Sequence, residues 1–262
     1  MKFKKSLGQN FLIDKNVIKK IVKIGNLNSK SLVLEIGPGL GNLTDEILKY
    51  KPKKVYAVEK DYDLFKKLNE KYKDNKNIKI FNHDAFDFQE ESLLEKNLVV
   101  YGNLPYNIST KLLVKWIMTK KWLPWFKCLI LMFQKEVGDR IIAKKNSKSY
   151  GRIAILTNLR LNFKKKFNVS KNCFFPKPKI DSSVIEFFPK INVNYKNLNP
   201  KKLEFVTRYF FSNRRKMIRK NYYKIFKNDK IKNKLRLNLN LRPENLDPEI
   251  YYKLSEILNL AK

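Results

Sequence analysis

The chain has 262 residues, enough for one large domain and a smaller one, and 43% of them are apolar, which suffices for an ordinary core. Lys and Arg number 57 against 24 Asp and Glu, so the formal net charge is +33. The apolar content excludes a disordered basic tail. The charge predicts a polyanionic partner, nucleic acid first, whose attraction weakens as salt rises.

Cysteine usage and the N-terminal residues predict a cytoplasmic protein. Cys128 and Cys173 lie in apolar stretches and show neither metal-ligand spacing nor a disulfide framework. The basic residues 1–5 precede an apolar run of only three residues, 11–13, which is too short for a signal peptide. No stretch approaches a membrane span. We therefore expect no metal site and no membrane contact.

The first predicted helix begins after Asp14, a typical N-cap, carries apolar residues at helical spacing from Val17 to Ile24 and ends at Gly25. From Leu32 onwards, strand and helix signals alternate. Strands are expected at 32–36, 55–58, 78–81, 98–101, 128–133 and 184–188, and helices around 43–50, 64–72, 112–116 and 135–144. This order is typical of an α/β fold with a doubly wound, mostly parallel sheet and helices on both faces.

Beyond about Asn192 the apolar pattern becomes helical. We expect a boundary between residues 189 and 200, which separates a cofactor-binding catalytic domain over 1–190 from a small α-helical, RNA-binding domain over 191–262. The leucines of residues 235–241 alternate with period two, which fits a helix poorly, although we place this run in the helical domain.

A glycine-rich turn, residues 35–41, follows the first strand of the predicted sheet. Its glycines let the main chain turn tightly and approach a ligand, and the next helix offers free N–H groups. The dinucleotide pattern G-x-G-x-x-G is not met, because the third glycine, Gly41, comes one residue early and Asn42 follows it. Glu35 and Pro38 suit the sulfonium cofactor S-adenosylmethionine better than a pyrophosphate. The predicted cofactor contacts in this turn are Glu35, Gly37 and Gly39.

Acidic residues stand at the ends of the next two strands. Glu59 ends the second strand, where a carboxylate can accept hydrogen bonds from both hydroxyls of a ribose. Asp84, followed by Ala85, comes after the third strand and can accept a hydrogen bond from an adenine amino group. Each acid alone is equally explained as a solvated residue, but suitable residue types at three successive strand ends favour a nucleoside cofactor. His83, the only histidine, is interpreted as structural or peripheral.

The segment Asn103-Leu104-Pro105-Tyr106 follows the fourth strand and predicts methyl transfer to an exocyclic base amine. Such an amine is a poor nucleophile because its lone pair is delocalised, so it needs oriented acceptors for its N–H protons rather than a strong base. The Asn103 side-chain oxygen and the Leu104 carbonyl are the expected acceptors, and Pro105 fixes the turn. Tyr106 can stack on a flipped-out base. Phe174 is either a second stacking face or a core aromatic.

Several segments together resemble the ribosomal RNA adenine dimethyltransferases: residues 6–12, 35–41, 103–106, 134–137, 150–152 and 174–182. The resemblance runs from about Ser6 to the last predicted helix and implies that Asn10 and Leu12 also contact the cofactor. It further implies N6,N6-dimethylation of two adjacent adenosines in the 3′-terminal hairpin loop of small-subunit (16S) rRNA, within the assembling 30S subunit. We expect the enzyme to be a monomer.

Residues 213–220 form the basic segment and are the predicted RNA contact. If the segment is helical, Arg215 and Arg219 lie one turn apart. A charge run is usually a solvated face, but Phe210 and Phe211 beside it indicate a buried side, and the family resemblance includes a basic motif here. The predicted RNA-binding residues are Arg214, Arg215, Lys216, Arg219 and Lys220. Phosphate contacts position a protein without selecting sequence, so target choice falls to RNA shape and the base pocket.

Three other functions remain open. A large-subunit (23S) rRNA adenine methyltransferase of the antibiotic-resistance type shares the cofactor and base motifs. A non-catalytic RNA- or DNA-binding relative would keep the fold, but the intact Asn103, Tyr106, Glu59 and Asp84 argue against it. A nicotinamide oxidoreductase is disfavoured by the glycine spacing.

Overall fold

A computed structural model describes residues 9–93, 97–119, 122, 124–191, 194–195, 197–227 and 229–258, with the side chains of residues 91, 92, 106 and 107 left out. Within these ranges no helix is both long and apolar enough to cross a bilayer. The chain groups into two compact units, which we describe separately.

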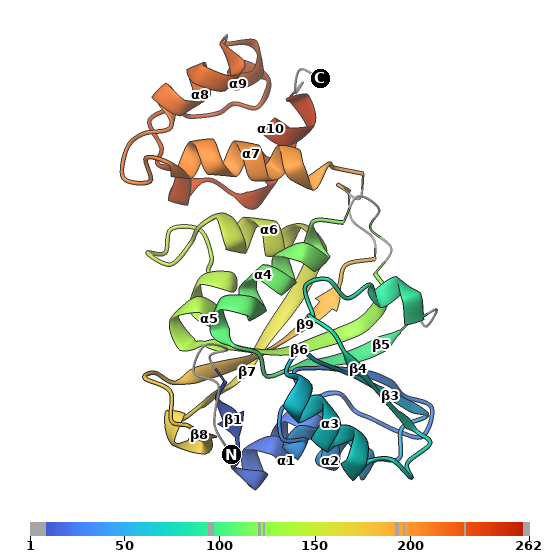
Figure 1. Cartoon of the computed structure of the whole chain (residues 1–262). Coiled ribbons are helices and arrows are strands. Elements are labelled where there is room, and N and C mark those ends of the chain that lie inside the picture. Colours follow the sequence, from blue (N-terminus) through green and yellow to red (C-terminus); the bar gives the residue numbers. More distant parts are fainter. Residues whose placement is uncertain are drawn as a thin grey trace. The chain divides into compact units, whose positions relative to one another are not determined.

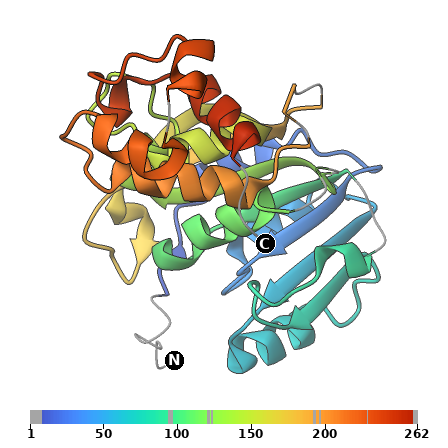
Figure 2. The same cartoon turned by 90° about the horizontal axis from the view of Figure 1, so that it is seen from above.

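The first unit contains Met1–Leu113, Leu123–Gly138 and Phe163–Pro189, and it is built around a seven-stranded sheet of order β4-β3-β2-β5-β6-β9-β7. The neighbours from β4 to β6 are parallel, and β9 joins β6 antiparallel (Figures 1 and 2). The strands are β2 (Leu32–Ile36), β3 (Lys54–Glu59), β4 (Ile78–Asn82), β5 (Leu98–Gly102), β6 (Phe126–Gln134), β7 (Leu161–Val169) and β9 (Ser182–Pro189). This confirms the predicted α/β fold with a mostly parallel sheet.

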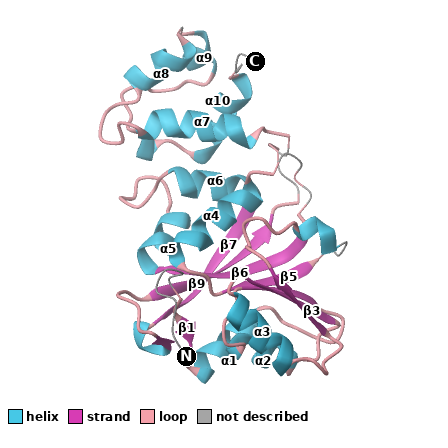
Figure 3. Ribbon diagram, viewed as in Figure 1, coloured by secondary structure: helices cyan, strands magenta, loops and turns pink. Residues whose placement is uncertain are grey.

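Three helices, α1 (Lys15–Ile24), α2 (Asn42–Leu48) and α3 (Tyr62–Lys71), cover one face of this sheet, and α4 (Tyr106–Ile117) and α5 (Lys135–Ile141) begin on the other (Figure 3). α1 forms as predicted: the Asp14 side chain accepts hydrogen bonds from the N–H groups of Asn16 and Val17, both at 2.9 Å. Its buried side chains, such as Val22, join a core that includes Val33, Val99 and Ile130 of the sheet.

Two short strands outside the main sheet bring distant segments together. β1 (Phe11–Leu12) pairs antiparallel with β8 (Phe174–Phe175), in the register Phe11 with Phe175 and Leu12 with Phe174. The remaining short elements of this unit are the 3₁₀ helices η2 (Glu90–Leu93) and η3 (Lys171–Cys173). The sequence contains no periodic signal for either two-residue strand.

The second unit contains Val114–Trp122, Asp139–Asn162 and Lys190–Lys262. Its helices are α6 (Arg152–Arg160), α7 (Pro200–Phe211), α8 (Arg219–Phe226), α9 (Lys230–Lys234), η4 (Pro243–Asn245) and α10 (Pro248–Ile257). They share one apolar core, with Ile155, Phe210, Tyr222 and Leu254 fully buried. The chain passes from the first unit to the second for the last time at residue 190, close to the point where the apolar pattern of the sequence becomes helical. The division into domains 1–190 and 191–262 stays a prediction.

The assignment of residues 235–241 to a helix, which their period-two spacing supports poorly, is wrong. α9 ends at Lys234, and Arg236 has a φ of +48°, so the main chain turns instead of continuing the helix. Leu237 and Leu239 are nevertheless buried in the core of the second unit. Their period-two spacing therefore comes from an irregular segment that buries alternate leucines.

Candidate active site

A cavity of about 280 Å³ lies in the first unit at the carboxyl ends of its parallel strands. It adjoins the place where the strand order reverses, between β2 and β5, which is where open α/β sheets bind ligands. All nine residues predicted to contact the cofactor line it: Asn10, Leu12, Glu35, Gly37, Gly39, Glu59, Asp84, Ala85 and Asn103. The fold thus brings together residues that the sequence places on five separate segments.

The glycine turn forms one wall of this cavity, and two of its glycines are required there. Gly37 and Gly39 have φ values of +69° and +60°, in the left-handed region that side chains rarely adopt. A Cβ on Gly39 would lie 2.8 Å from the Phe11 ring, and one on Gly37 would lie 3.1 Å from Leu104. Side chains at these positions would fill the space that a ligand needs.

Glu59 is held at the cavity by main-chain hydrogen bonds. Its Oε2 accepts from the Gly39 N–H at 3.1 Å, and its Oε1 accepts from the Asp61 N–H at 2.8 Å. The side chain is buried, and this burial raises the pKa of the carboxyl above its usual value. Main-chain donors thus orient the carboxyl at the cavity, where a carboxylate can accept from ribose hydroxyls.

Asp84 has a partner that the sequence did not predict. Lys60 donates to Asp84 Oδ2 at 2.7 Å, the Phe86 N–H donates to Oδ1 at 2.8 Å, and Lys60 itself lines the cavity. The hydrogen bond from Lys60 is the main reason that the pKa of Asp84 is lowered. Asp84 is therefore an ionised acceptor, as recognition of an amino group requires, and the buried Ala85 follows it.

Glu35 is the most buried acid of the site, with 1% of its surface exposed. Its Oε2 lies 2.7 Å from the hydroxyl of Thr44 on α2. Burial raises the pKa of Glu35 to about 8, which outweighs the lowering by the Thr44 hydrogen bond. Burial therefore favours the protonated carboxyl at neutral pH.

The predicted base-binding segment leaves β5 and enters α4 beside the cofactor residues. Asn103, Leu104 and Pro105 line the same cavity, and the Pro105 carbonyl accepts from the N–H of Ile108 at 2.8 Å. Among the described residues the Asn103 side chain has no hydrogen bond, so its amide oxygen is available to a substrate amine. Tyr106 begins α4, but its side chain lies outside the described part, and its stacking role stays a prediction.

Phe174 is a core aromatic that also lines the cavity. It is 3% exposed and belongs to the core of the first unit, yet it also lines the cavity. Pairing of β8 with β1 brings it there, opposite Leu12. Its contact with a target base stays a prediction.

The donor set fits S-adenosylmethionine. Glu35, Glu59 and Asp84 line the cavity, and Lys60 is the only lysine or arginine among the described lining residues. Glu59 and Asp84 supply carboxylate acceptors for the hydroxyl and amino groups of a nucleoside, as this cofactor requires. The described residues contain no group of three or more His, Cys, Asp or Glu suited to a metal ion.

The structure adds cavity residues that sequence reasoning missed. Gln9 and Asn42 line the cavity, as does His83, which the sequence analysis had interpreted as structural or peripheral. Asn42 was noted only as the residue that breaks the dinucleotide pattern. A signal for Gln9 was available, because it stands next to Asn10 in the segment that carries the family resemblance.

The helix expected for the basic segment is only partly present. Residues 213–218 form turns, and α8 begins at Arg219, because the Lys216 N–H bonds to Asn213 and the Ile218 N–H bonds to the Leu241 carbonyl at 2.9 Å. Arg215 and Arg219 are therefore not one helical turn apart. The exposed cations of the segment are Arg215, Lys216, Arg219 and Lys220.

Arg214 differs from its neighbours because it binds the protein itself. Its Nε donates to Glu244 Oε2 at 2.9 Å, and its Nη2 donates to the carbonyls of Ser147 and Lys148. These contacts tie the loop before α6 to η4. They occupy the guanidinium that the sequence analysis assigned to RNA.

Comparison with known proteins identifies the family. The model of the family described as ribosomal RNA adenine dimethylase matches residues 1–260. The chain is 52% identical over 255 residues to ribosomal RNA small subunit methyltransferase A of Pelagibacter ubique, covering 97% of this chain and 96% of that one. It is 42% identical over 261 residues to the protein of the same name from a Wolbachia strain of Drosophila simulans, covering 97% and 93%.

Solved structures agree with this assignment. A dimethyladenosine transferase from Plasmodium falciparum superposes with a TM-score of 0.78 at 27% identity, over 93% of this chain and 95% of that one. The 23S rRNA methyltransferase ErmE shares the fold, with a TM-score of 0.70 at 23% identity, over 95% and 99%. With the cavity's donor set, these matches show that the chain belongs to the ribosomal RNA adenine dimethylase family of S-adenosylmethionine-dependent enzymes.

Proposed function

We propose that this enzyme dimethylates the N6 amino groups of two adjacent adenosines in the 3′-terminal hairpin loop of 16S rRNA, on the assembling 30S subunit. We further propose that it acts in the cytoplasm as a monomer. The observation that carries the chemistry is the position of Asn103, whose free amide lies in the same cavity as the acids and glycines expected to hold the cofactor. The small-subunit target is supported by relatives of that name that match nearly the whole chain.

Different residues of the chain would contact different parts of the cofactor. Glu59 would accept from the ribose hydroxyls, Asp84 from the adenine amino group, and the glycine turn would approach the ligand with its main chain. The segment with Asn10 and Leu12 would cover it. When bound, S-adenosylmethionine supplies an electrophilic methyl group.

Orientation of the target amine falls to Asn103 and Leu104. The Asn103 Oδ1 and the Leu104 carbonyl accept hydrogen bonds from the two N–H protons, which favours a pyramidal nitrogen whose lone pair is withdrawn from conjugation with the ring. Once methylated, the nitrogen loses one proton to water. In the second round one N–H remains, so a single acceptor suffices and the first methyl group takes the other position. Tyr106 and Phe174 are the proposed stacking faces for the base.

Transfer of labelled methyl groups to unmethylated 30S subunits, with unmethylated 23S rRNA in parallel and mapping of the modified nucleotides, tests this function. We expect dimethyladenosine confined to the 3′ hairpin loop of 16S rRNA. Label in 23S rRNA alone would mean that the proposed reaction is right but that the target is 23S rRNA. The shared fold with ErmE is the reason for including this RNA. Absence of label in both RNAs would contradict the assignment.

A further inference from the structure

The N-terminal strap, residues 9–12, forms a wall of the cofactor cavity opposite the glycine turn. All four of its residues line the cavity, although 19 residues lie between the strap and β2, the nearest strand of the main sheet, which begins at Leu32. The strap belongs to no layer of the sheet. Its position is therefore set by contacts outside the main sheet, and Leu12 is buried in the core of the first unit.

Main-chain pairing supplies only part of that positioning. β1 pairs with β8 over two residues, and the Ile13 N–H donates to the Cys173 carbonyl at 2.9 Å. A two-residue pairing is weak because isolated strand pairs are marginal in water. At the other end of the strap, Gln9 Nε2 donates to Asp61 Oδ2 at 3.1 Å.

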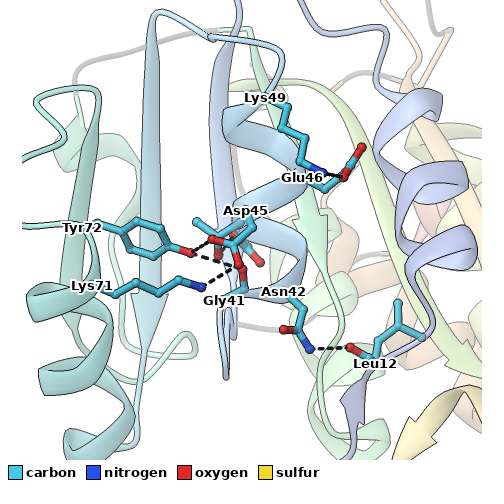
Figure 4. A network of polar contacts seen from close by, with 10 residues as sticks. Leu12, Gly41, Asn42, Asp45, Glu46, Lys49, Lys71 and Tyr72 are labelled. Atoms are coloured by element: carbon cyan, nitrogen blue, oxygen red, sulfur yellow. Dashed lines mark hydrogen bonds and ion pairs between the residues drawn. The ribbon is translucent and has the colours of Figure 1, made fainter.

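Asn42 connects the strap to the glycine turn directly. It is the first residue of α2, lines the cavity, and donates from its Nδ2 to the Leu12 carbonyl at 2.9 Å (Figure 4). With Ile13 bonded to Cys173, both ends of the peptide group between Leu12 and Ile13 are fixed. The Asn42 side chain thereby hydrogen-bonds the strap to the start of α2.

Helix α2 itself has little need of this side chain. Its N-cap is Gly41, so no side-chain capping bond is made at that end, and the Asn42 amide points to Leu12 instead. The start of α2 is anchored separately, since the Tyr72 hydroxyl contacts the Gly41 carbonyl and donates to Asp45 Oδ1 at 2.7 Å (Figure 4). Loss of the Asn42 bond should therefore free the strap and leave the turn in place.

We propose that Asn42 is a positioning residue for the cofactor, whose amide ties the strap to the glycine turn and slows escape of the bound cofactor. This inference rests on the family's use of S-adenosylmethionine. One ordinary hydrogen bond is at stake, so Asn42→Ala should raise the cofactor Kd and its dissociation rate about 5-fold. The kcat at saturating cofactor should stay within about 2-fold, because Asn42 does not orient the target amine.

Asn42→Asp separates positioning from a merely structural role. A carboxylate at the first position of a helix stabilises the helix, and a further negative charge in the cavity would by itself attract a cationic ligand. The carboxylate cannot donate to the Leu12 carbonyl and instead repels it. We expect an unchanged or raised Tm together with a Kd at least as weak as that of Asn42→Ala.

The control is Lys49→Ala at the C-cap of α2, which breaks the 2.6 Å ion pair between the exposed Lys49 and the largely buried Glu46 (Figure 4). Its cofactor affinity and release rate should match those of the wild type. Kd by calorimetry, release by stopped flow and hydrogen exchange of the Ile13 amide are the readouts, with faster exchange expected in both Asn42 variants. Wild-type affinity and exchange in both variants would overturn the inference, whereas a wild-type chain that fails to bind S-adenosylmethionine would overturn the assigned chemistry instead.

Discussion

The cofactor cavity and the basic segment differ in how their ionisable side chains are held: those of the cavity are hydrogen-bonded, and those of the basic segment are mostly exposed. Three acids line the cavity, and the one lysine among the described lining residues is paired with Asp84. Each acid has a fixed hydrogen-bond partner, and burial alters the pKa of Glu35 and Glu59. In the basic segment, Arg215, Lys216, Arg219 and Lys220 are exposed.

The two regions therefore act on their ligands over different distances. A buried, oriented charge acts at short range and selects a ligand by its position. Exposed cations act over about a Debye length, attract any polyanion and lose strength as salt rises. The cavity can therefore select a nucleoside cofactor by the positions of its carboxyl oxygens, while the net charge of +33 acts on a polyanion. The following changes should affect one region and leave the other unaltered.

The largest effect is expected at Asn103. Asn103→Ala removes the proposed acceptor of the amine proton, and loss of one such oriented group typically lowers kcat by about 100- to 1,000-fold. Cofactor affinity should change only a few-fold and binding to 30S subunits should not change. Single-turnover transfer of labelled methyl groups measures the rate of transfer, calorimetry measures cofactor affinity, and filter binding measures binding to 30S subunits. Turnover within a few-fold of the wild type would contradict the proposed activation of the amine.

Glu35→Gln tests the buried charge of the cavity. The folded-state pKa of about 8 lies above the ordinary 4.5, so the folded chain keeps a proton that the unfolded chain loses. The resulting stability is complete below pH 4.5 and is lost as pH rises to about 8. At roughly 1.4 kcal/mol per pH unit, the upper limit is about 5 kcal/mol.

A glutamine is neutral at every pH and can still accept from Thr44. Urea unfolding at pH 5, 7 and 9 should therefore show the variant gaining stability relative to the wild type as pH rises. RNA affinity should follow the wild type throughout. A difference between the two proteins that does not vary with pH would show that Glu35 is already ionised.

Combined substitution of Arg215, Lys216 and Arg219 by Ala tests the exposed charge. If each contacts one phosphate, the slope of log K against log salt should fall by about 2, and RNA affinity by roughly 10- to 100-fold at physiological salt. Cofactor binding should be unaffected. The matched control replaces the exposed Lys19, Lys20 and Lys23 of α1, which removes the same net charge. An equal loss of slope in the control would place no special RNA contact at the basic segment.

The site could be predicted from the sequence because its signals are local. Buried parallel strands appear as short apolar runs, and the residues that follow them lie at one edge of the sheet. Glu35, Glu59 and Asp84 could therefore be placed together without knowing how the strands pair. Their partners could not, since Lys60 and Thr44 carry no motif of their own.

Elements that depend on distant contacts were missed for physical reasons. α6 is buried nearly all round, from Ala154 to Arg160, so it lacks the one-sided apolar pattern of a surface helix. β7 carries three successive lysines at 164–166 and does not resemble a buried strand. The turns at 213–218 end where Ile218 bonds to Leu241, a contact that no local pattern could indicate.

Arg214 and Arg215 are neighbours in sequence, but we expect Arg214 to contribute to stability and Arg215 to RNA binding. Their single substitutions have the smallest expected effects. Arg214→Ala removes the bond to Glu244 and those to the Ser147 and Lys148 carbonyls, which should cost about 1 kcal/mol because the site is partly exposed. That loss lowers Tm by about 2–4 °C and leaves the salt slope of RNA binding unchanged. Arg215→Ala should do the reverse, with Tm unchanged and the slope smaller by about 0.7. A lower slope in Arg214→Ala at wild-type Tm would return Arg214 to the RNA-binding surface, since only a guanidinium free of its protein partners could contribute there.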